Sequence, residues 1–98
     1  MDKVLNMLGL SVRARKAVSG GFSVEKAVRE KTAELVIVSL DASDNTKKKF
    51  SDKCSFYGVP FVLYGDKVSL GHALGQEERT SVAVLDPGFA KAILKLTE

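Results

Sequence analysis

Hydrophobic positions along the chain alternate between helical spacing and short continuous runs. Apolar residues three or four positions apart predict helices that begin after Asp2, near Phe22, at Ser43 or Asp44, after Asp66 and at Asp86-Pro87. The continuous runs predict strands at Ala17-Val18, Leu35–Val38, Phe61–Tyr64 and Val82–Leu85. Helices and strands are therefore expected to follow one another strictly, with a helix at each end of the chain.

The strand predicted at Leu35–Val38 indicates how these elements are layered. It is continuously apolar and mostly β-branched, which is typical of a central strand covered on both faces. Gly58 and Gly75 mark the ends of the third and fourth helices. Four short strands with helices between them predict an α/β fold, a three-layer α/β/α sandwich around a four-stranded mixed sheet. Residues 1–98 are expected to form a single domain.

The charge of the chain is unevenly distributed. The formal net charge is only +3, which does not by itself identify a nucleic-acid partner. Residues 1–53 contain 11 Lys and Arg against 7 Asp and Glu, whereas residues 54–98 contain 4 against 5. A basic first half favours a polyanionic partner.

The sequence carries no mark of a membrane or of an oxidising compartment. No apolar run approaches the roughly 18 residues that a membrane-spanning helix needs, and the first residues do not resemble a signal peptide. Cys54 is the only cysteine, so no disulfide can form within the chain. A cytoplasmic protein without a membrane partner is expected.

Few residue types that carry catalysis are present. His72 is the only histidine and is interpreted as a polar helix residue, while Cys54 is expected to be a buried thiol. One cysteine and one histidine cannot supply the ligands of a usual zinc site. Glu77 and Glu78 are adjacent in a predicted loop, where both should face water. No catalytic residue, metal or cofactor is therefore predicted; a small hydrolase would require a pocket that joins His72 to one of these glutamates.

A basic segment and a glycine pair precede the second predicted helix. Arg13-Ala14-Arg15-Lys16 leads into Ser19-Gly20-Gly21. Glycines before a helix let another backbone approach closely, and the free amides with the helix dipole attract phosphate. Lys26 is expected in the first turns of that helix, projecting toward the same anion, and Arg29 comes from the same helix. An ordinary turn with solvated charges is the alternative interpretation.

Two further polar segments are weaker candidates for RNA contact. Lys47-Lys48-Lys49 would spread over most of the circumference of a helix, which favours a solvated face over a docking stripe. The loop from Gly75 to Ser81 contains Arg79 as its only base, next to two glutamates. From the residues alone, RNA binding is only suggested.

Several motifs, taken in order, resemble those of a known family. They are Gly20–Val28, Ala33–Val38, Asp41-Ala42-Ser43, Leu70–Gly75 and Val82-Ala83-Val84. Together they resemble the ribosomal protein L-seven-Ae family, which binds kink-turn RNA, and within it the short bacterial YlxQ-like branch. The resemblance covers nearly the whole chain.

The resemblance implies an α/β/α sandwich that docks RNA with one edge. That edge comprises the turn before the second helix, the start of that helix and the loop after the fourth helix. By position, Gly20 matches the glycine that allows the RNA backbone to approach closely. Lys26 matches the lysine that reaches guanine edges. Residues Gln76–Ser81 match the loop that covers the kink. The RNA-contacting residues expected from the sequence and the resemblance together are Arg13, Arg15, Lys16, Ser19, Gly20, Gly21, Phe22, Ser23, Lys26, Arg29, Gln76, Arg79, Thr80 and Ser81.

Two departures from the family pattern shape the expected target. The guanine-reading Asn-Glu pair of the family falls on Phe22 and Ser23, and the loop carries Glu77 and Glu78 where strong kink-turn binders have neutral residues. Each lost bidentate base contact costs about 1–3 kcal/mol. We therefore expect weaker or differently targeted RNA binding. The protein as a whole is expected to be a monomeric, non-enzymatic binder of bent or kink-turn-like RNA, ribosomal RNA included, that works beside ribonucleoprotein proteins. The alternative is a protein-interaction module that kept the fold, lost the RNA and uses Phe22 as its anchor.

Overall fold

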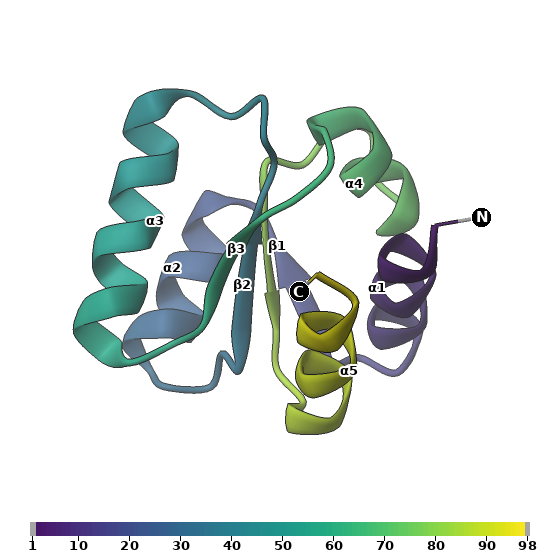
Figure 1. Ribbon diagram of the computed structural model, residues 1–98, viewed down its shortest axis with the longest axis horizontal. Helices are drawn as coiled ribbons and strands as arrows, with labels where there is room; N and C mark the ends of the chain where they lie inside the picture. The colour runs from purple at the N-terminus through teal and green to yellow at the C-terminus, as the bar shows by residue number, and fades with distance from the viewer. Residues whose placement is uncertain (1, 98) are drawn as a thin grey trace.

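Helices and strands alternate without exception in the computed structural model of the protein, which describes residues 2–97 (Figure 1). The helices are α1 (Lys3–Arg13), α2 (Gly21–Arg29), α3 (Asp44–Tyr57), α4 (Lys67–Ala73) and α5 (Pro87–Thr97). The strands are β1 (Ala17–Ser19), β2 (Leu35–Val38), β3 (Phe61–Leu63) and β4 (Ser81–Val84). The order predicted from hydrophobic spacing is confirmed.

The four strands form one mixed sheet in the order β1-β4-β2-β3. Strand β4 runs antiparallel to both of its neighbours, whereas β2 and β3 are parallel. Every residue of β2 and of β4 is buried, because these two strands occupy the middle of the sheet. The central position predicted for Leu35–Val38 is confirmed.

Helices cover both faces of this sheet, as Figure 1 shows. On one face α1, α4 and α5 pack around Leu8, Ile37 and Ile93. On the other, α2 and α3 pack around Val28 and Phe50. The protein is thus the predicted three-layer α/β/α sandwich, and no helix among residues 2–97 has the length and apolarity needed to cross a lipid bilayer.

Helix ends are fixed by local caps that the sequence largely predicts. The Asp2 carboxylate accepts a hydrogen bond from the Leu5 amide (3.1 Å) and one from the Tyr64 hydroxyl (2.6 Å). The Tyr64 bond is the main reason that the pKa of Asp2 lies below its usual value. At α3 the cap is Ser43, not Asp44, since the Ser43 hydroxyl accepts from the Thr46 amide at 3.1 Å.

Observed boundaries differ from the predicted ones by about one residue. The second helix begins at Gly21 with Gly20 as its cap, one residue earlier than expected. Tyr64 lies outside β3, although its amide still donates to the Val38 carbonyl at 3.0 Å, because Gly65 then turns the chain with φ 67°. Leu85 likewise lies just beyond β4.

Candidate nucleic-acid interface

A glycine turn joins β1 to α2 at the upper end of the sheet in Figure 1. Gly20 has φ 91° and ψ 150°, a backbone conformation that a residue with a Cβ adopts only under strain. Its N–H donates to the Ser81 carbonyl at 3.1 Å, and its own carbonyl accepts from the Val24 amide at 3.0 Å. The turn is therefore anchored on one side to β4 and on the other to the first turn of α2.

The space outside this turn is open. A Cβ added at Gly20 or Gly21 would meet nothing within 4 Å, and no side chain among residues 2–97 caps the start of α2. The first amides of the helix thus have no side-chain cap beside an open surface, and an uncapped helix start is the arrangement that binds phosphate or another anion. Phe22 stands beside them with 79% of its surface exposed.

The loop between α4 and β4 is clipped to the glycine turn by Arg79. Its Nε donates to the Ser19 hydroxyl at 3.1 Å, one terminal nitrogen donates to the Glu78 carbonyl at 2.9 Å, and the other to the Gln76 side-chain oxygen at 3.2 Å. These bonds use three of about five guanidinium N–H groups. Arg79 therefore joins the two segments into one surface and keeps two donors for a ligand.

Close packing of α4 also fixes this loop. A Cβ at Gly71 would lie 2.5 Å from the Glu77 carbonyl oxygen, so only glycine lets the loop pass so near the helix. The Gln76 amide donates to the Gly71 carbonyl at 2.8 Å, and the Arg79 amide donates to the Lys67 carbonyl at 3.0 Å. The loop is held by its backbone, which leaves the Gln76 and Glu77 side chains exposed.

Charges near the turn favour an anion on the α2 side. Lys26 is exposed and makes no ion pair with any of residues 2–97. It is the sixth residue of α2, in the second turn of this nine-residue helix, within the first turns that the sequence predicts. The neighbouring Glu25 carboxylate is paired with Lys49 Nζ (2.9 Å) and Lys53 Nζ (3.3 Å), and the Lys49 bond is the main reason that the pKa of Glu25 lies below its usual value.

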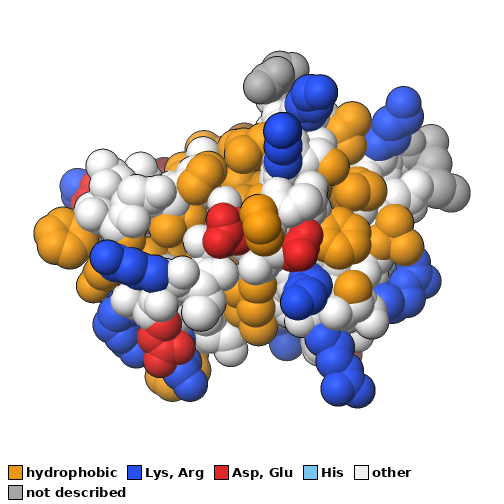
Figure 2. Space-filling model, turned by 90° about the horizontal axis from the view of Figure 1, so that it is seen from below, with side chains coloured by type: hydrophobic (Ala, Val, Ile, Leu, Met, Phe, Trp, Pro, Cys, Tyr) orange, Lys and Arg blue, Asp and Glu red, His pale blue; other side chains and the backbone are white. Residues whose placement is uncertain are grey.

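The predicted contact residues do not all lie on this surface. The Leu85 amide donates to the Lys16 carbonyl at 2.7 Å, so Lys16 lies beside the far end of β4, about 13 Å from Gly20 along the strand. Arg13 and Arg15 lie at that far end too, which corrects the expectation that the basic segment adjoins the glycine turn. Figure 2 views this lower end, where most Lys and Arg side chains stand toward the outline, and hydrophobic side chains with acidic ones among them lie toward the centre.

Two further predicted contact residues lie away from the open turn or beneath the surface. Ser81 is fully buried, so it supports the turn through its carbonyl and cannot itself touch RNA. Arg29 is the last residue of α2, and it lies about 12 Å along the helix axis from Gly21. Half-buried Thr80 and Ser23 remain at the surface beside the turn.

The segment after β2 belongs to the same edge and was not predicted. The Ser39 amide donates to the Thr80 carbonyl at 2.9 Å, which places Leu40, 57% exposed, near the clipped loop. The Asp41 carboxylate accepts from the Lys67 amide at 3.0 Å and ties this segment to α4. Only the strand order, with β4 antiparallel to β2, brings these residues together.

The residues considered for catalysis do not converge. His72 is an exposed residue of α4, as predicted, and the pocket that it lines contains neither Glu77 nor Glu78. Cys54 is buried, as predicted, and burial raises the pKa of its thiol to about 11. Within residues 2–97 no group of three or more His, Cys, Asp or Glu residues could hold a metal ion.

Comparisons with known proteins agree on one family. The profile of the ribosomal protein L7Ae/L30e/S12e/Gadd45 family matches residues 2–94. The chain is 46% identical over 92 residues to the RNA-binding protein YlxQ of Bacillus subtilis, covering 94% of this chain and 92% of that protein. It is 32% identical over 100 residues to the large ribosomal subunit protein eL30 of Pyrobaculum islandicum, covering 100% and 98% of the two chains.

Solved structures agree with these sequence relationships. A protein of unknown function from Bacillus halodurans superimposes with a TM-score of 0.94 at 42% identity, covering 98% of this chain and 97% of that one. The 15.5kD RNA binding protein of Giardia lamblia superimposes with a TM-score of 0.81 at 22% identity, covering 98% and 86%. The second likeness concerns the fold alone.

Proposed function

Because the chain belongs to the ribosomal protein L7Ae/L30e/S12e/Gadd45 family, we propose that it is a non-enzymatic RNA-binding protein that recognises bent, kink-turn-like RNA. The whole chain forms one RNA-binding domain in the cytoplasm, which binds ribosomal RNA or the RNA of another ribonucleoprotein. The single observation that carries the proposal is the open glycine turn, where uncapped amides of α2 stand next to the clipped α4–β4 loop.

In the proposed complex each part of the edge has its own role. The RNA backbone passes over Gly20 and Gly21, where no Cβ obstructs it, and a phosphate accepts hydrogen bonds from the first amides of α2. Phe22 stacks on an unpaired base, because RNA is read largely through splayed bases and shape. Lys26 contacts a guanine edge or a phosphate in the adjoining groove. Arg79 keeps the loop in place and offers its two remaining donors to the backbone.

Fluorescence-anisotropy titration with a kink-turn RNA and with a matched duplex that lacks the bulge tests the proposal. Wild-type protein should bind the kink-turn more tightly, because a straight duplex cannot contact the turn and the loop together. Equal affinity for the two RNAs, or binding to neither at low salt, would contradict the proposal.

Two exposed phenylalanines provide a matched pair of variants. Phe22→Ala should weaken binding by about 1–3 kcal/mol, the range measured when a stacking aromatic is removed. Phe56→Ala removes an equally exposed ring, 81% against 79%, from α3 outside the proposed edge and should leave affinity unchanged. Equal effects of the two substitutions would exclude stacking at Phe22.

Two lysine variants, one inside and one outside the proposed interface, test the role of Lys26. Lys26→Ala should weaken binding and reduce the slope of log affinity against log salt by about one, whereas Lys95→Ala on α5 should change neither. An unchanged salt slope in Lys26→Ala would remove this lysine from the interface.

Exposure of Phe22 also favours a second candidate, a protein-interaction module anchored by that ring. Capture of partners from cell lysate with and without ribonuclease separates the two candidates. Partners that depend on Phe22 and survive ribonuclease would favour the protein-interaction module, whereas partners lost on digestion would favour RNA binding.

A further inference from the structure

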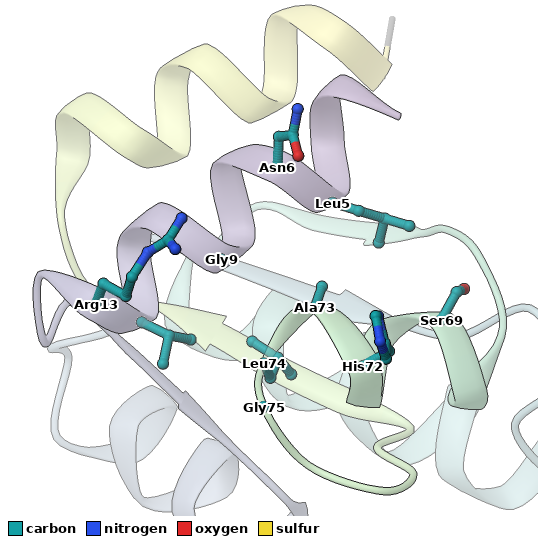
Figure 3. A pocket seen from close by; sticks show the side chains of 10 residues that line it. Leu5, Asn6, Gly9, Arg13, Ser69, His72, Ala73, Leu74 and Gly75 are labelled. Atoms are coloured by element: carbon teal, nitrogen blue, oxygen red, sulfur yellow. The ribbon is translucent and has the colours of Figure 1, made fainter. Parts of the chain in front are cut away.

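A groove of about 570 Å³ runs between α1 and α4, outside the surface described above (Figure 3). The two helices approach each other closely where both residues are small: a Cβ at Gly9 would lie 3.3 Å from the Ala73 carbonyl oxygen. Leu5, Val12 and Leu74 give the groove a mainly apolar lining. Its volume falls within the range of pockets that bind drug-sized ligands.

The polar side chains of the groove favour an anionic, partly aromatic ligand. Arg13 is the one charged side chain that lines it, and no acidic side chain does so among residues 2–97. His72 lines the same groove from α4 and presents a flat ring (Figure 3). Apolar walls, a flat ring and one guanidinium match a nucleotide, whose base can stack while its phosphate pairs with arginine.

The groove lies between two surfaces already described. One end of the groove includes Gly75, which follows α4 and precedes the clipped loop that begins at Gln76. Arg13, which is followed by exposed Arg15 and Lys16, lies toward the same end from α1, whereas Leu5 and Ser69 line the opposite end (Figure 3). Figure 1 shows the same continuity, with α1 running from beside α4 down to the start of β1. A strand that leaves the glycine edge past the loop would therefore reach the groove at the end where Gly75 and Arg13 lie, next to the basic segment.

We propose that the α1–α4 groove binds an unpaired stretch of the same RNA, with a base between the apolar wall and His72 and a phosphate on Arg13. This inference rests on the proposed function, which it extends by a single-stranded subsite. It also gives the basic segment a role, since Arg15 and Lys16 contact the phosphates that follow.

Matched RNAs test the inference directly. The kink-turn RNA is compared with versions that carry a six-uridine tail on each strand end in turn. One tail position should raise the affinity of the wild-type protein by at least about fivefold, the lower end of the effect of stacking one base. Arg13→Gln should abolish that gain, while it weakens binding of the untailed RNA no more than the loss of one distant positive charge does. Lys3→Gln, which removes the same charge from α1 outside the groove, should keep the gain.

Three results would overturn the inference: no tail raises affinity, Arg13→Gln weakens tailed and untailed RNA equally, or Lys3→Gln removes the gain as well. Amide chemical shifts of Gly9 and Gly75 during titration with a uridine hexamer alone provide a readout that does not need the kink-turn. Shifts at both glycines without kink-turn binding would support the groove and reject the proposed function. A response to hexaglutamate but not to the uridine hexamer would replace RNA with an acidic protein segment.

Discussion

At position 20 the backbone conformation, and not the surrounding space, restricts which residue type the fold accepts. Its φ of 91° and ψ of 150° lie in a region that is nearly exclusive to glycine, although the space outside would accept a methyl group. We expect Gly20→Ala to reduce the free energy of unfolding by about 1–3 kcal/mol, the cost of holding a Cβ-bearing residue in such a region. Urea denaturation of the two proteins measures this difference.

Gly21→Ala is the matched control. Gly21 also has open space around its Cβ position, but its φ is not positive and it begins a helix. Alanine should therefore be neutral or stabilising by up to about 1 kcal/mol, because it restricts the unfolded chain. Equal losses at both positions would show that the methyl group, not the backbone conformation, is responsible.

Burial of Cys54 predicts an unreactive thiol. The side chain is 1% exposed, and burial raises the pKa of the thiol to about 11, so almost no thiolate exists at pH 8. In folded protein, modification by a thiol reagent at pH 8 should occur no faster than transient opening of the fold. Rates measured with increasing urea test this, and a fast reaction without urea would contradict the burial. Ser55→Cys, one position along α3 and exposed, is the positive control when placed in a Cys54→Ala background.

At the scale of elements, Gly71 decides how the α4–β4 loop is placed. A Cβ there would lie 2.5 Å from a backbone oxygen, which no side-chain adjustment can relieve. Gly71→Ala should therefore cost about 1–3 kcal/mol of stability, as overpacking does, and move the loop that Arg79 clips. Denaturation together with hydrogen exchange at the 76–81 amides measures both effects.

Gly9→Ala provides the comparison on the neighbouring helix. The nearest atom to a Cβ at Gly9 is 3.3 Å away, so a shift of a few tenths of an ångström suffices. Its effect should be smaller than that of Gly71→Ala, and the loop amides should exchange at the wild-type rate. Faster exchange in both variants would mean that the loop responds to general loosening of α4.

The Glu25 carboxylate joins α2 to α3 and predicts a dependence on pH. Its pKa is lowered chiefly by the Lys49 hydrogen bond, so the folded state binds the proton less readily than the unfolded chain. The stabilisation is therefore present above the usual pKa of about 4.5 and is lost as the pH falls through the lower folded value. Glu25→Gln should be less stable than wild type at pH 7, and the difference should vanish at low pH.

Added salt should reduce the difference in stability between Glu25→Gln and wild type, because the side chains of Glu25, Lys49 and Lys53 are partly exposed. Glu30→Gln, at the end of the same helix and without an ion pair among residues 2–97, should match wild type throughout. If Glu25→Gln remained less stable than wild type at a pH below the pKa of Glu25, the loss would come from packing and not from the ion pairs.

At the scale of the whole molecule, hydrophobic spacing predicts nearly all of the elements. Leu35–Val38 could be placed at the centre because its unbroken β-branched run has no polar face to expose. The layers follow from the alternation of helices and strands. The strand order could not be predicted, since the local pattern of β1 is compatible with pairing to any neighbour.

Strand order explains which of the predicted site residues lie together and which lie apart. Gly20 and the 76–81 loop meet because β1 pairs antiparallel with β4, a contact between segments about 60 residues apart. The same register carries Lys16 to the other end of β4, although it lies only four positions before Gly20. Distance along the chain was a poor guide to distance in space, and Leu40 was missed for the same reason.

Binding of RNA to an edge assembled from three such distant segments should stabilise the whole fold, because unfolding separates all of the contact residues at once. At a free RNA concentration of 100 times the dissociation constant, kink-turn RNA should add about 2.7 kcal/mol to the free energy of unfolding. For a chain of 98 residues that corresponds to a rise in Tm of at least about 10 °C in differential scanning fluorimetry. Bulge-deleted RNA at the same concentration should give a much smaller rise, and Phe22→Ala should reduce the kink-turn effect while Phe56→Ala keeps it. Equal shifts with both RNAs would mean that general phosphate attraction, with no recognition of shape, accounts for binding.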